Sequence, residues 1–208
     1  MRSSDVPIPA HVPQRPRGEA SAATPYPAHL VEAWHLDDGT PVTIRPIRGS
    51  DMAIERAFLA GLSSQTRYQR LLSARKLLPG ELRRLTHIEY ERDMALVATA
   101  WFDGVETLLG VARYVRLADA RSAEFAIVIG DAWQRRGLGK KLTRNLLDVA
   151  AWHGLQCLVG LTLTGNVRMQ VLARKLGFTL ALDRGDATVT HLRRLLGPVP
   201  ETAATLNA

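Results

Sequence analysis

The sequence predicts a mixed α+β fold, in which a mixed, mostly antiparallel twisted sheet is flanked by helices. Short β-rich runs are separated by turn residues such as Asp103-Gly104, a pattern that favours hairpins. Residues Gly137–His153 instead repeat apolar residues at helical spacing. From 123 to 182 strand and helix patterns alternate, so we expect helices to cover the sheet.

The first elements are a hairpin and a helix. Val31–Leu36 is expected as a short strand, and the turn residues of Asp37–Pro41 connect it to a second strand over 42–47. Ser50-Asp51 can cap the helix that follows, because short polar side chains accept hydrogen bonds from the first N–H groups of a helix.

Two more helices are expected before the central strands. Ser63-Ser64 caps a stretch that continues through Leu72. Pro79 suits the first position of a helix over Gly80–His87, because that position leaves its N–H unpaired and proline has none.

The second half of the chain holds the regular pattern. Met94–Phe102 and Thr107–Val115 are β-rich runs that form a hairpin, and Ala123–Ile129 is the next strand. The long helix places one apolar residue per turn on a single face. Its apolar face comprises Leu138, Leu142, Leu146, Val149 and Ala150, and it is followed by a strand over 158–164, a helix over 167–176 ended by Gly177, and strands over 178–182 and 188–195.

Composition predicts one folded domain with two tails. The chain has 208 residues, and residues 1–27 carry six of its eleven prolines without periodicity, which predicts a flexible tail. We expect the domain over 28–197 and a second flexible tail over 198–208. No run approaches the ~20 apolar residues of a membrane span, and no secretory signal is present, so neither a membrane partner nor export is expected. The single cysteine, Cys157, is expected to be buried and fits a reducing compartment, so a cytoplasmic location is expected.

The charge has an uneven distribution. The net charge is +7, and residues 134–175 hold eight Lys/Arg against the single acid Asp148. Such a surface suits nucleic acid, an acidic protein face or a polyphosphate ligand, although a solvated helix surface is an equally simple explanation. No nucleic-acid motif accompanies the basic residues, so a nucleic-acid partner is not expected. The scattered histidines and lone cysteine have no metal-ligand spacing, so no metal is expected.

The loop before the long helix predicts a phosphate site. A helix start leaves backbone N–H groups unpaired and partially positive, and the glycines Gly137 and Gly139 let a bulky anion approach them. Arg135, Arg136 and Lys140 add charge at the end where the helix dipole disfavours it, unless an anion is bound. Neither a dinucleotide fingerprint nor a P-loop fits these residues.

The hexapeptide Gln134-Arg135-Arg136-Gly137-Leu138-Gly139 between a strand and a helix resembles the GNAT acetyltransferase superfamily, whose corresponding loop binds the pyrophosphate of acetyl-CoA. Downstream, Asn166, Met169, Leu172, Leu176 and Gly177-Phe178 are similar to the rest of that family's signature. The resemblance implies that Asn166 bonds the pantetheine arm of the donor. Asn166 also suits a helix N-cap, and the two roles are compatible.

The segments 38–47, 62–70, 91–98 and 173–178 are similar to one branch of that superfamily, the catalytic domain of bacterial protein lysine acetyltransferases that modify acyl-CoA synthetases. The likeness covers roughly residues 26–195. Many of those enzymes also carry a large synthetase-like domain, which this sequence does not contain, so regulation through it is not implied. Ala173 stands where many GNAT enzymes have a tyrosine general acid, so another group, or water, is expected to protonate the thiolate.

Glu124 is the expected general base. It begins the strand that leads to the loop, and related lysine acetyltransferases have a glutamate at the matching place. The alternative is a structural pair with a neighbour such as Arg121. The resemblance also implies that the backbone at Ile127, Val128 and Ile129 binds pantetheine. The expected donor-binding residues are therefore Ile127, Val128, Ile129, Gln134, Arg135, Arg136, Gly137, Leu138, Gly139, Lys140 and Asn166.

The resulting prediction is an acyl-CoA-dependent N-acetyltransferase. We expect it to move an acetyl group from acetyl-CoA directly to a primary amine, foremost a protein lysine such as one of an acyl-CoA synthetase. A small-molecule amine is the alternative acceptor. A non-catalytic acyl-CoA sensor or a nucleic-acid-binding protein is the alternative of another class. A monomer and a homodimer are both compatible with the sequence.

Overall fold

The computed structural model describes residues 25–71 and 79–197. The expected tails over 1–27 and 198–208 lie outside the described residues, apart from 25–27. Tyr26 already belongs to the packed structure: its hydroxyl donates to the carbonyl of Pro46 at 3.2 Å, and its ring meets Tyr90 edge-on. The guanidinium of Arg48 covers the ring of Tyr26, 4.4 Å from its centre. Tyr26, which the sequence assigns to the tail over 1–27, therefore packs against the domain.

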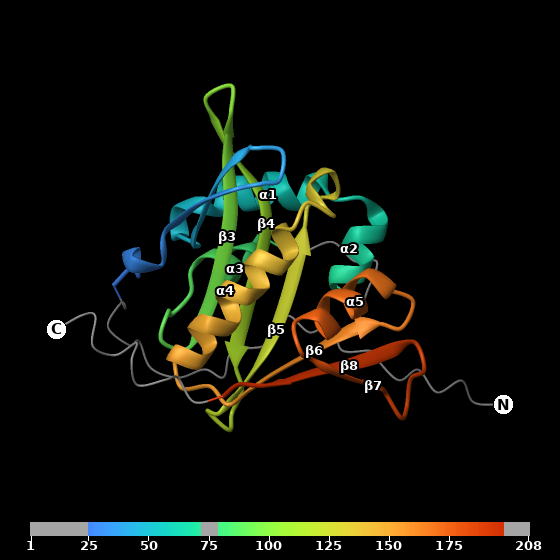
Figure 1. Cartoon of the computed structure of the whole chain (residues 1–208). Coiled ribbons are helices and arrows are strands. Elements are labelled where there is room, and N and C mark those ends of the chain that lie inside the picture. Colours follow the sequence, from blue (N-terminus) through green and yellow to red (C-terminus); the bar gives the residue numbers. More distant parts are fainter. Residues whose placement is uncertain (1–24, 72–78, 198–208) are drawn as a thin grey trace.

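The described residues form one eight-stranded sheet in the order β1-β2-β3-β4-β5-β6-β8-β7 (Figure 1). Neighbouring strands are antiparallel except β5 and β6, which are parallel. This confirms the predicted mixed, mostly antiparallel sheet. The strands are β1 Glu32–His35, β2 Pro41–Pro46, β3 Asp93–Phe102, β4 Val105–Arg116, β5 Ser122–Ile129, β6 Cys157–Leu163, β7 Thr179–Leu182 and β8 Val189–Leu195.

Helices cover both faces of the sheet (Figure 1). The helix α4 crosses one face, and α1 and α3 pack on the other, where Phe58 of α1 joins Val97 and Val111 in a second apolar cluster. The helix α2 lies beside β5 and β6, and α5 packs against β7. The α-helices are α1 Met52–Gly61, α2 Ser64–Leu71, α3 Pro79–Thr86, α4 Leu138–Trp152 and α5 Val167–Lys175.

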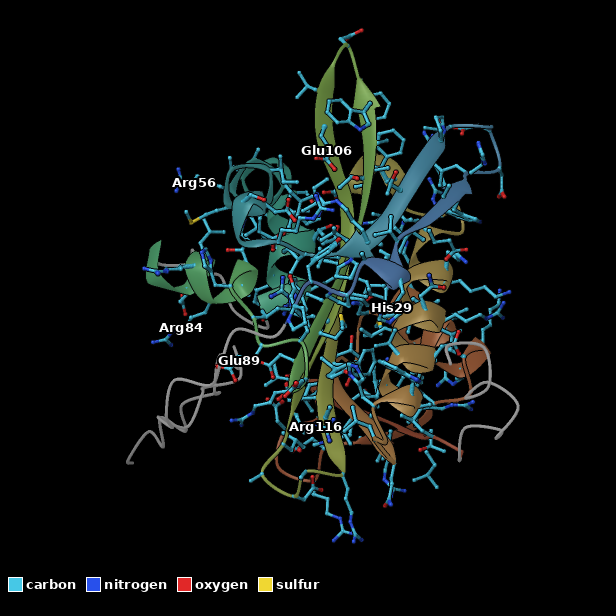
Figure 2. The ribbon with its side chains drawn as sticks, turned by 90° about the vertical axis from the view of Figure 1, so that its left-hand side faces the viewer. His29, Arg56, Arg84, Glu89, Glu106 and Arg116 are labelled. Atoms are coloured by element: carbon cyan, nitrogen blue, oxygen red, sulfur yellow. The ribbon has the colours of Figure 1, made fainter. Side chains whose placement is uncertain are left out.

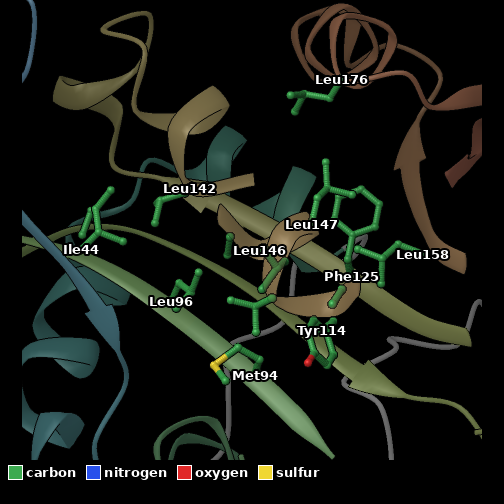
Figure 3. Packing of buried hydrophobic residues seen from close by; sticks show 14 of the residues in the cluster. Ile44, Met94, Leu96, Tyr114, Phe125, Leu142, Leu146, Leu147, Leu158 and Leu176 are labelled. Carbon is green, nitrogen blue, oxygen red and sulfur yellow. The ribbon is translucent and has the colours of Figure 1, made fainter. Parts of the chain in front are cut away.

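The main core lies between α4 and the sheet, as Figure 3 shows. Leu138, Leu142 and Leu146 are each fully buried, which confirms the apolar face predicted from their spacing. Each such side chain contributes about 1.5–3 kcal/mol of burial free energy. Tyr114 of β4 is also fully buried in this core, and its hydroxyl bonds Nδ1 of His153 just beyond the end of α4. Cys157 is buried, as expected.

Buried ion pairs connect the strands to α1 on the other face. Arg45 of β2 donates to both carboxylate oxygens of Asp51 and to Glu106 of β4. These acceptors raise the pKa of Arg45 despite the opposing effect of burial. Glu106 lies near one end of β4 and Arg116 at the other end, so β4 runs the length of the domain (Figure 2). Asp51 occupies the N-cap position of α1, but its side chain accepts no hydrogen bond from the first turn of that helix, so the expected cap is wrong. The carboxylate is engaged instead by Arg45 of β2 and by the Arg48 N–H at 2.7 Å.

The strands β5 and β6 part halfway along their length. They pair from Ser122 opposite Cys157 to Glu124 opposite Val159, and the pairing ends there. At the next step Phe125 lies against Gly160, where a Cβ would come within 2.7 Å of the ring and 3.0 Å of the Phe125 carbonyl. The aromatic ring is buried and packs on Phe178 with ring centres 4.7 Å apart. This parting opens a gap in the sheet.

None of the helices within residues 25–71 and 79–197 is long and apolar enough to cross a membrane. Within those ranges, no three His, Cys, Asp or Glu side chains gather as metal ligands.

Candidate active site

A cavity of about 560 Å³ lies where β5 and β6 part. Its wall includes Ile127 and Ile129, which face α4, and Ala126 and Val128, which alternate with them toward α2, so the cavity is lined from both faces of the sheet. Its other lining residues are Thr66, Gln69, Arg70, Phe125, Gln134, Arg135, Gly137, Gly139, Lys140, Leu161, Thr162, Asn166, Val167, Arg168, Met169, Val171, Leu172, Lys175 and Leu192.

At one end of the cavity, the loop before α4 has an unusual backbone. Arg135 has a φ of 66° and Gly137 a φ of 79°, both in the left-handed region. Gly137 occupies the N-cap position of α4, and no side chain there accepts a hydrogen bond from the first turn. A helix start with uncapped N–H groups and a preceding left-handed turn provides a concave row of donors that suits a phosphate.

Asp131 fixes this loop to α2. Its carboxylate accepts hydrogen bonds from the Ser63 N–H at 2.9 Å, the Ser63 hydroxyl at 2.7 Å and the Thr66 hydroxyl at 2.6 Å. Partial burial acts against ionisation, but these hydrogen bonds outweigh it and lower the pKa of Asp131. Asp131 therefore shapes the loop by attaching it to the start of α2. Ser63 also caps α2, as expected, by accepting from the Thr66 N–H at 3.2 Å.

Gln134 has a structural role in the same loop. Its amide donates to the carbonyl of Ile129 at 3.2 Å and to the Thr66 hydroxyl at 3.3 Å. Its amide oxygen accepts from Arg168 of α5 at 3.2 Å. Gln134 therefore connects the end of β5, α2 and α5 around the mouth of the cavity.

The cavity wall is cationic. Among the described residues that line it, none is Asp or Glu, and five are cations: Arg70, Arg135, Lys140, Arg168 and Lys175. Cations in a partly enclosed, low-dielectric wall attract an anion more strongly than they would in open water. The wall therefore suits a ligand with several phosphate charges.

The three cations that the sequence assigns to the loop do not all face the cavity. Arg135 and Lys140 line the cavity. Arg136 instead pairs with Asp38 in the turn between β1 and β2 at 2.7 Å, and its guanidinium lies over the ring of Trp133. The side chain of Leu138 is fully buried in the core, so only its backbone N–H can serve a ligand. The spacing of a motif does not reveal in which direction each loop side chain points.

Asn166 lines the cavity and caps α5. Its side-chain oxygen accepts from the Met169 N–H at 3.2 Å, which confirms the N-cap interpretation. Its amide nitrogen retains the capacity to donate to a ligand. Ala173, in the same helix, is buried in the core and does not line the cavity, so its position offers no acid there.

Glu124 lies at the inner end of the gap, on the last paired position of β5. By alternation its side chain shares a face with Ala126, which lines the cavity, and that face is the one toward α2. Arg70 of α2 lines the cavity and acts electrostatically on Glu124.

A buried charge cluster lies behind Arg70. Glu55 of α1 is almost fully buried and accepts from Arg113 of β4 at 3.2 Å. Burial raises the pKa of Glu55, and Arg113 opposes that shift. Burial lowers the pKa of Arg70 to about 10, and Arg113 acts in the same direction. Arg70 therefore remains a cation at neutral pH.

Several lining residues were not predicted from the sequence. Thr66, Gln69 and Arg70 are spaced i, i+3 and i+4, so they share one face of α2. That spacing was readable, but nothing in the sequence showed that this face meets the end of β5. Arg168 and Lys175 belong to the basic stretch already noted, and only the packing of α5 beside the gap brings them to the site.

Comparison with known families shows to which family the chain belongs. The Acetyltransferase (GNAT) family matches residues 63–178, which contain β5, the loop, α4 and α5. The chain belongs to this acetyltransferase family. The predicted resemblance, fold class and enzyme class are thereby confirmed.

Individual relatives agree. A curated acetyltransferase of Pseudomonas aeruginosa is 37% identical over 161 residues, which cover 77% of this chain and 86% of the relative. Acetyltransferase Pat of Mycolicibacterium smegmatis is 31% identical over 135 residues, or 64% of this chain, but the match spans only 40% of Pat. The crystal structure of the GNAT domain of S. lividans PAT has a TM-score of 0.75 at 26% identity, covering 83% of this chain and all of that domain. The chain is therefore similar to the catalytic domain of PAT enzymes.

Proposed function

We propose that this GNAT enzyme transfers an acetyl group from acetyl-CoA to a primary amine, and that the amine is a lysine side chain of a protein. The observation that carries the proposal is the cavity at the parting of β5 and β6, which is lined at one end by the loop that opens α4 and elsewhere by Phe125 and Ala126, the residues that follow Glu124 in β5. Two parts of the cavity wall suit two parts of acetyl-CoA. The uncapped N–H groups at the start of α4 suit the diphosphate, and the unpaired edge of β5 suits the amides of the pantetheine arm.

The residues present fit the donor. Arg135 and Lys140, with the N–H groups that open α4, would hold the diphosphate. The β5 backbone at Ile127–Ile129 lines the cavity beyond the last pair with β6, so its polar groups can bond the pantetheine amides in place of a neighbouring strand. Asn166 has an amide nitrogen available on the opposite side.

Glu124 is the proposed general base. A lysine amine has a pKa near ~10.4, so at neutral pH it enters protonated and must lose a proton before its nitrogen can attack a thioester carbonyl. Glu124 accepts that proton at the inner end of the cavity, and the new N–C bond forms as the C–S bond breaks. Arg70, close enough to act on Glu124, stabilises its ionised form and disfavours a second positive charge on the amine. The nitrogen loses its second proton as the amide forms, and the departing CoA thiolate takes up that proton through water.

Two observations favour a protein lysine over a small polycation. The relatives include the acetyltransferase named Pat and the GNAT domain of PAT, the branch whose substrates the sequence likeness predicts. The cavity wall carries cations and, among its described residues, no carboxylate, so it would repel a polyamine. Acyl-CoA synthetases are the first class of protein acceptor to test.

The test is acetyl transfer from labelled acetyl-CoA to a panel of purified acyl-CoA synthetases, with spermidine and free amino acids as small acceptors. We expect label on lysine residues of at least one synthetase, and the Glu124→Gln protein serves as the matched control. Label on small amines alone would contradict the protein acceptor. If the protein binds acetyl-CoA but transfers the acetyl group to none of these amines, the result would contradict the proposed transferase activity and favour a non-catalytic acyl-CoA sensor.

A further inference from the structure

The strand β1 lies at the edge of the sheet beside α4. Its residues alternate between half-buried and exposed, so Glu32 and Trp34 point the same way, toward α4. The carboxylate of Glu32 pairs with Lys141 and accepts from the Asn145 amide at 2.8 Å. Two successive turns of α4 are thereby attached to β1.

Trp34 packs behind the left-handed turn of the loop. A Cβ at Gly137 would lie 3.7 Å from Cη2 of Trp34, at van der Waals distance. The indole is half-buried and packs against the main core. Further along the same hairpin, Asp38 pairs with Arg136 at 2.7 Å, on the other side of the turn. The hairpin therefore contacts the loop and α4 at three positions: Glu32, Trp34 and Asp38.

We propose that the β1–β2 hairpin is the support that positions the diphosphate-binding loop, with Trp34 as its principal positioning residue. The inference rests on the proposed function. It adds a role for a segment that lies outside the cavity and outside the 63–178 match to the GNAT family.

The physical reason lies in the loop backbone. The left-handed conformations at Arg135 and Gly137 cost free energy and persist only where the surroundings hold them. Trp34 fills the space behind Gly137, so the turn cannot relax in that direction. Glu32 and Asp38 neutralise Lys141 and Arg136, which reduces the repulsion among the cations at the helix start and leaves Arg135 and Lys140 to face the ligand.

The hairpin acts on the diphosphate end of the donor alone. The test compares a ligand that has the diphosphate, CoA, with pantetheine, which lacks it. For Trp34→Ala we expect the Kd of CoA, measured by calorimetry, to rise about tenfold or more, the scale on which small misplacements of binding groups act. We expect the Kd of pantetheine, measured by ligand-observed NMR, to stay at the wild-type value, and Trp34→Phe to restore most of the CoA affinity.

The matched control is Trp101→Ala, because Trp101 is 66% exposed near the tip of the β3–β4 hairpin and, by strand alternation, faces away from the side of Phe102, whose ring stacks on Trp133. We expect it to leave both Kd values unchanged. An unchanged CoA affinity in Trp34→Ala, or an equal loss for CoA and pantetheine, would overturn the inference. A wild-type protein that binds no CoA would instead overturn the proposed function, so the two failures are distinguishable.

Discussion

Gly160 of β6 lies so close to Phe125 of β5 that a Cβ at position 160 would come within 2.7 Å of the aromatic ring. The two residues occupy the first unpaired step after Glu124 and Val159. The pairing of β5 with β6 ends one step before this contact, and the cavity is lined by β5 from Phe125 onward. The close contact between Phe125 and Gly160 therefore lies where the cavity begins.

Replacing Gly160 by alanine should strain this junction. The new Cβ would meet two ring atoms at 2.7 and 2.9 Å and the Phe125 carbonyl at 3.0 Å, and the carbonyl belongs to backbone that cannot swing away. Overpacking of this kind costs about 1–3 kcal/mol of unfolding free energy. Urea unfolding measures the loss. The control is Gly165→Ala, where a Cβ meets nothing within 4 Å and stability should be unchanged. Equal stability of the two variants would contradict the steric account.

Glu124→Gln should abolish most turnover while preserving donor binding. Glutamine keeps the shape of glutamate but cannot accept a proton, and general-base catalysis contributes about 10²–10⁴-fold to rate. We therefore expect kcat, measured with the acceptor found by the transfer assay, to fall by that factor. The Kd of CoA should stay within about twofold, since Glu124 lies away from the diphosphate end. Full activity of this variant would remove Glu124 from its proposed role and favour a structural pair with a basic neighbour.

The two glycines of the loop should differ in what they cost when replaced. Gly137 has a φ of 79°, which an alanine adopts only at a cost of about 1–2 kcal/mol, so Gly137→Ala should be less stable. Gly139 has no positive φ, and its Cβ would meet Leu172 and Ile129 at 3.5 and 3.6 Å, ordinary contact distances. Gly139→Ala should therefore keep the wild-type Tm but weaken CoA binding, because it adds a methyl group to the cavity wall. A lower Tm for Gly139→Ala together with an unchanged Tm for Gly137→Ala would contradict this description of the loop.

His153 should make the protein less stable in mild acid. Its Nδ1 bonds the hydroxyl of Tyr114, and the tautomer of the neutral imidazole sets which of the two groups donates. Burial lowers the pKa of His153, and the nearby Arg116 and His29 act in the same direction. The unfolded chain, with a histidine pKa near ~6.5, thus takes up the proton first as the pH falls, and unfolding free energy is lost below that pH.

Thermal unfolding between pH 7.5 and 5.5 tests this sign. The Tm of the wild-type protein should fall over this range, and His153→Gln should show a smaller fall, although its Tm at pH 7.5 is lower because the Tyr114 contact is changed. The exposed His35 supplies the control, since His35→Gln should keep the wild-type slope. Parallel slopes for all three proteins would contradict the assignment.

Most helices and strands were predicted correctly, because the signals that specify them act between residues that are close in the sequence. The face of α4 follows from leucines at helical spacing, and the β3–β4 hairpin follows from Asp103-Gly104, where both residues have positive φ. The cap of α5 by Asn166 was likewise predicted from the sequence. Glycines and cations at the start of a helix are also the signals from which the sequence predicts a phosphate site in the loop before α4, a prediction that the binding experiments test.

Other parts of the site depend on tertiary packing. No pattern in β5 or β6 shows that the strands part after Glu124, where Phe125 packs closely against Gly160, because the two residues are far apart in the sequence. The cation pattern of the loop could not separate Arg136, paired with Asp38, from Arg135, which lines the cavity. Arg70 lines the cavity because α2 packs beside β5, a contact that the sequence does not predict.

Isothermal calorimetry of the wild-type protein with CoA tests the central claim most directly. If the start of α4 grips a diphosphate beside the parted strands, CoA should bind one per chain with measurable heat, and saturating CoA should raise the Tm. Pantetheine, which lacks the diphosphate, should bind far more weakly. No heat and no thermal protection with CoA would contradict the account of this site.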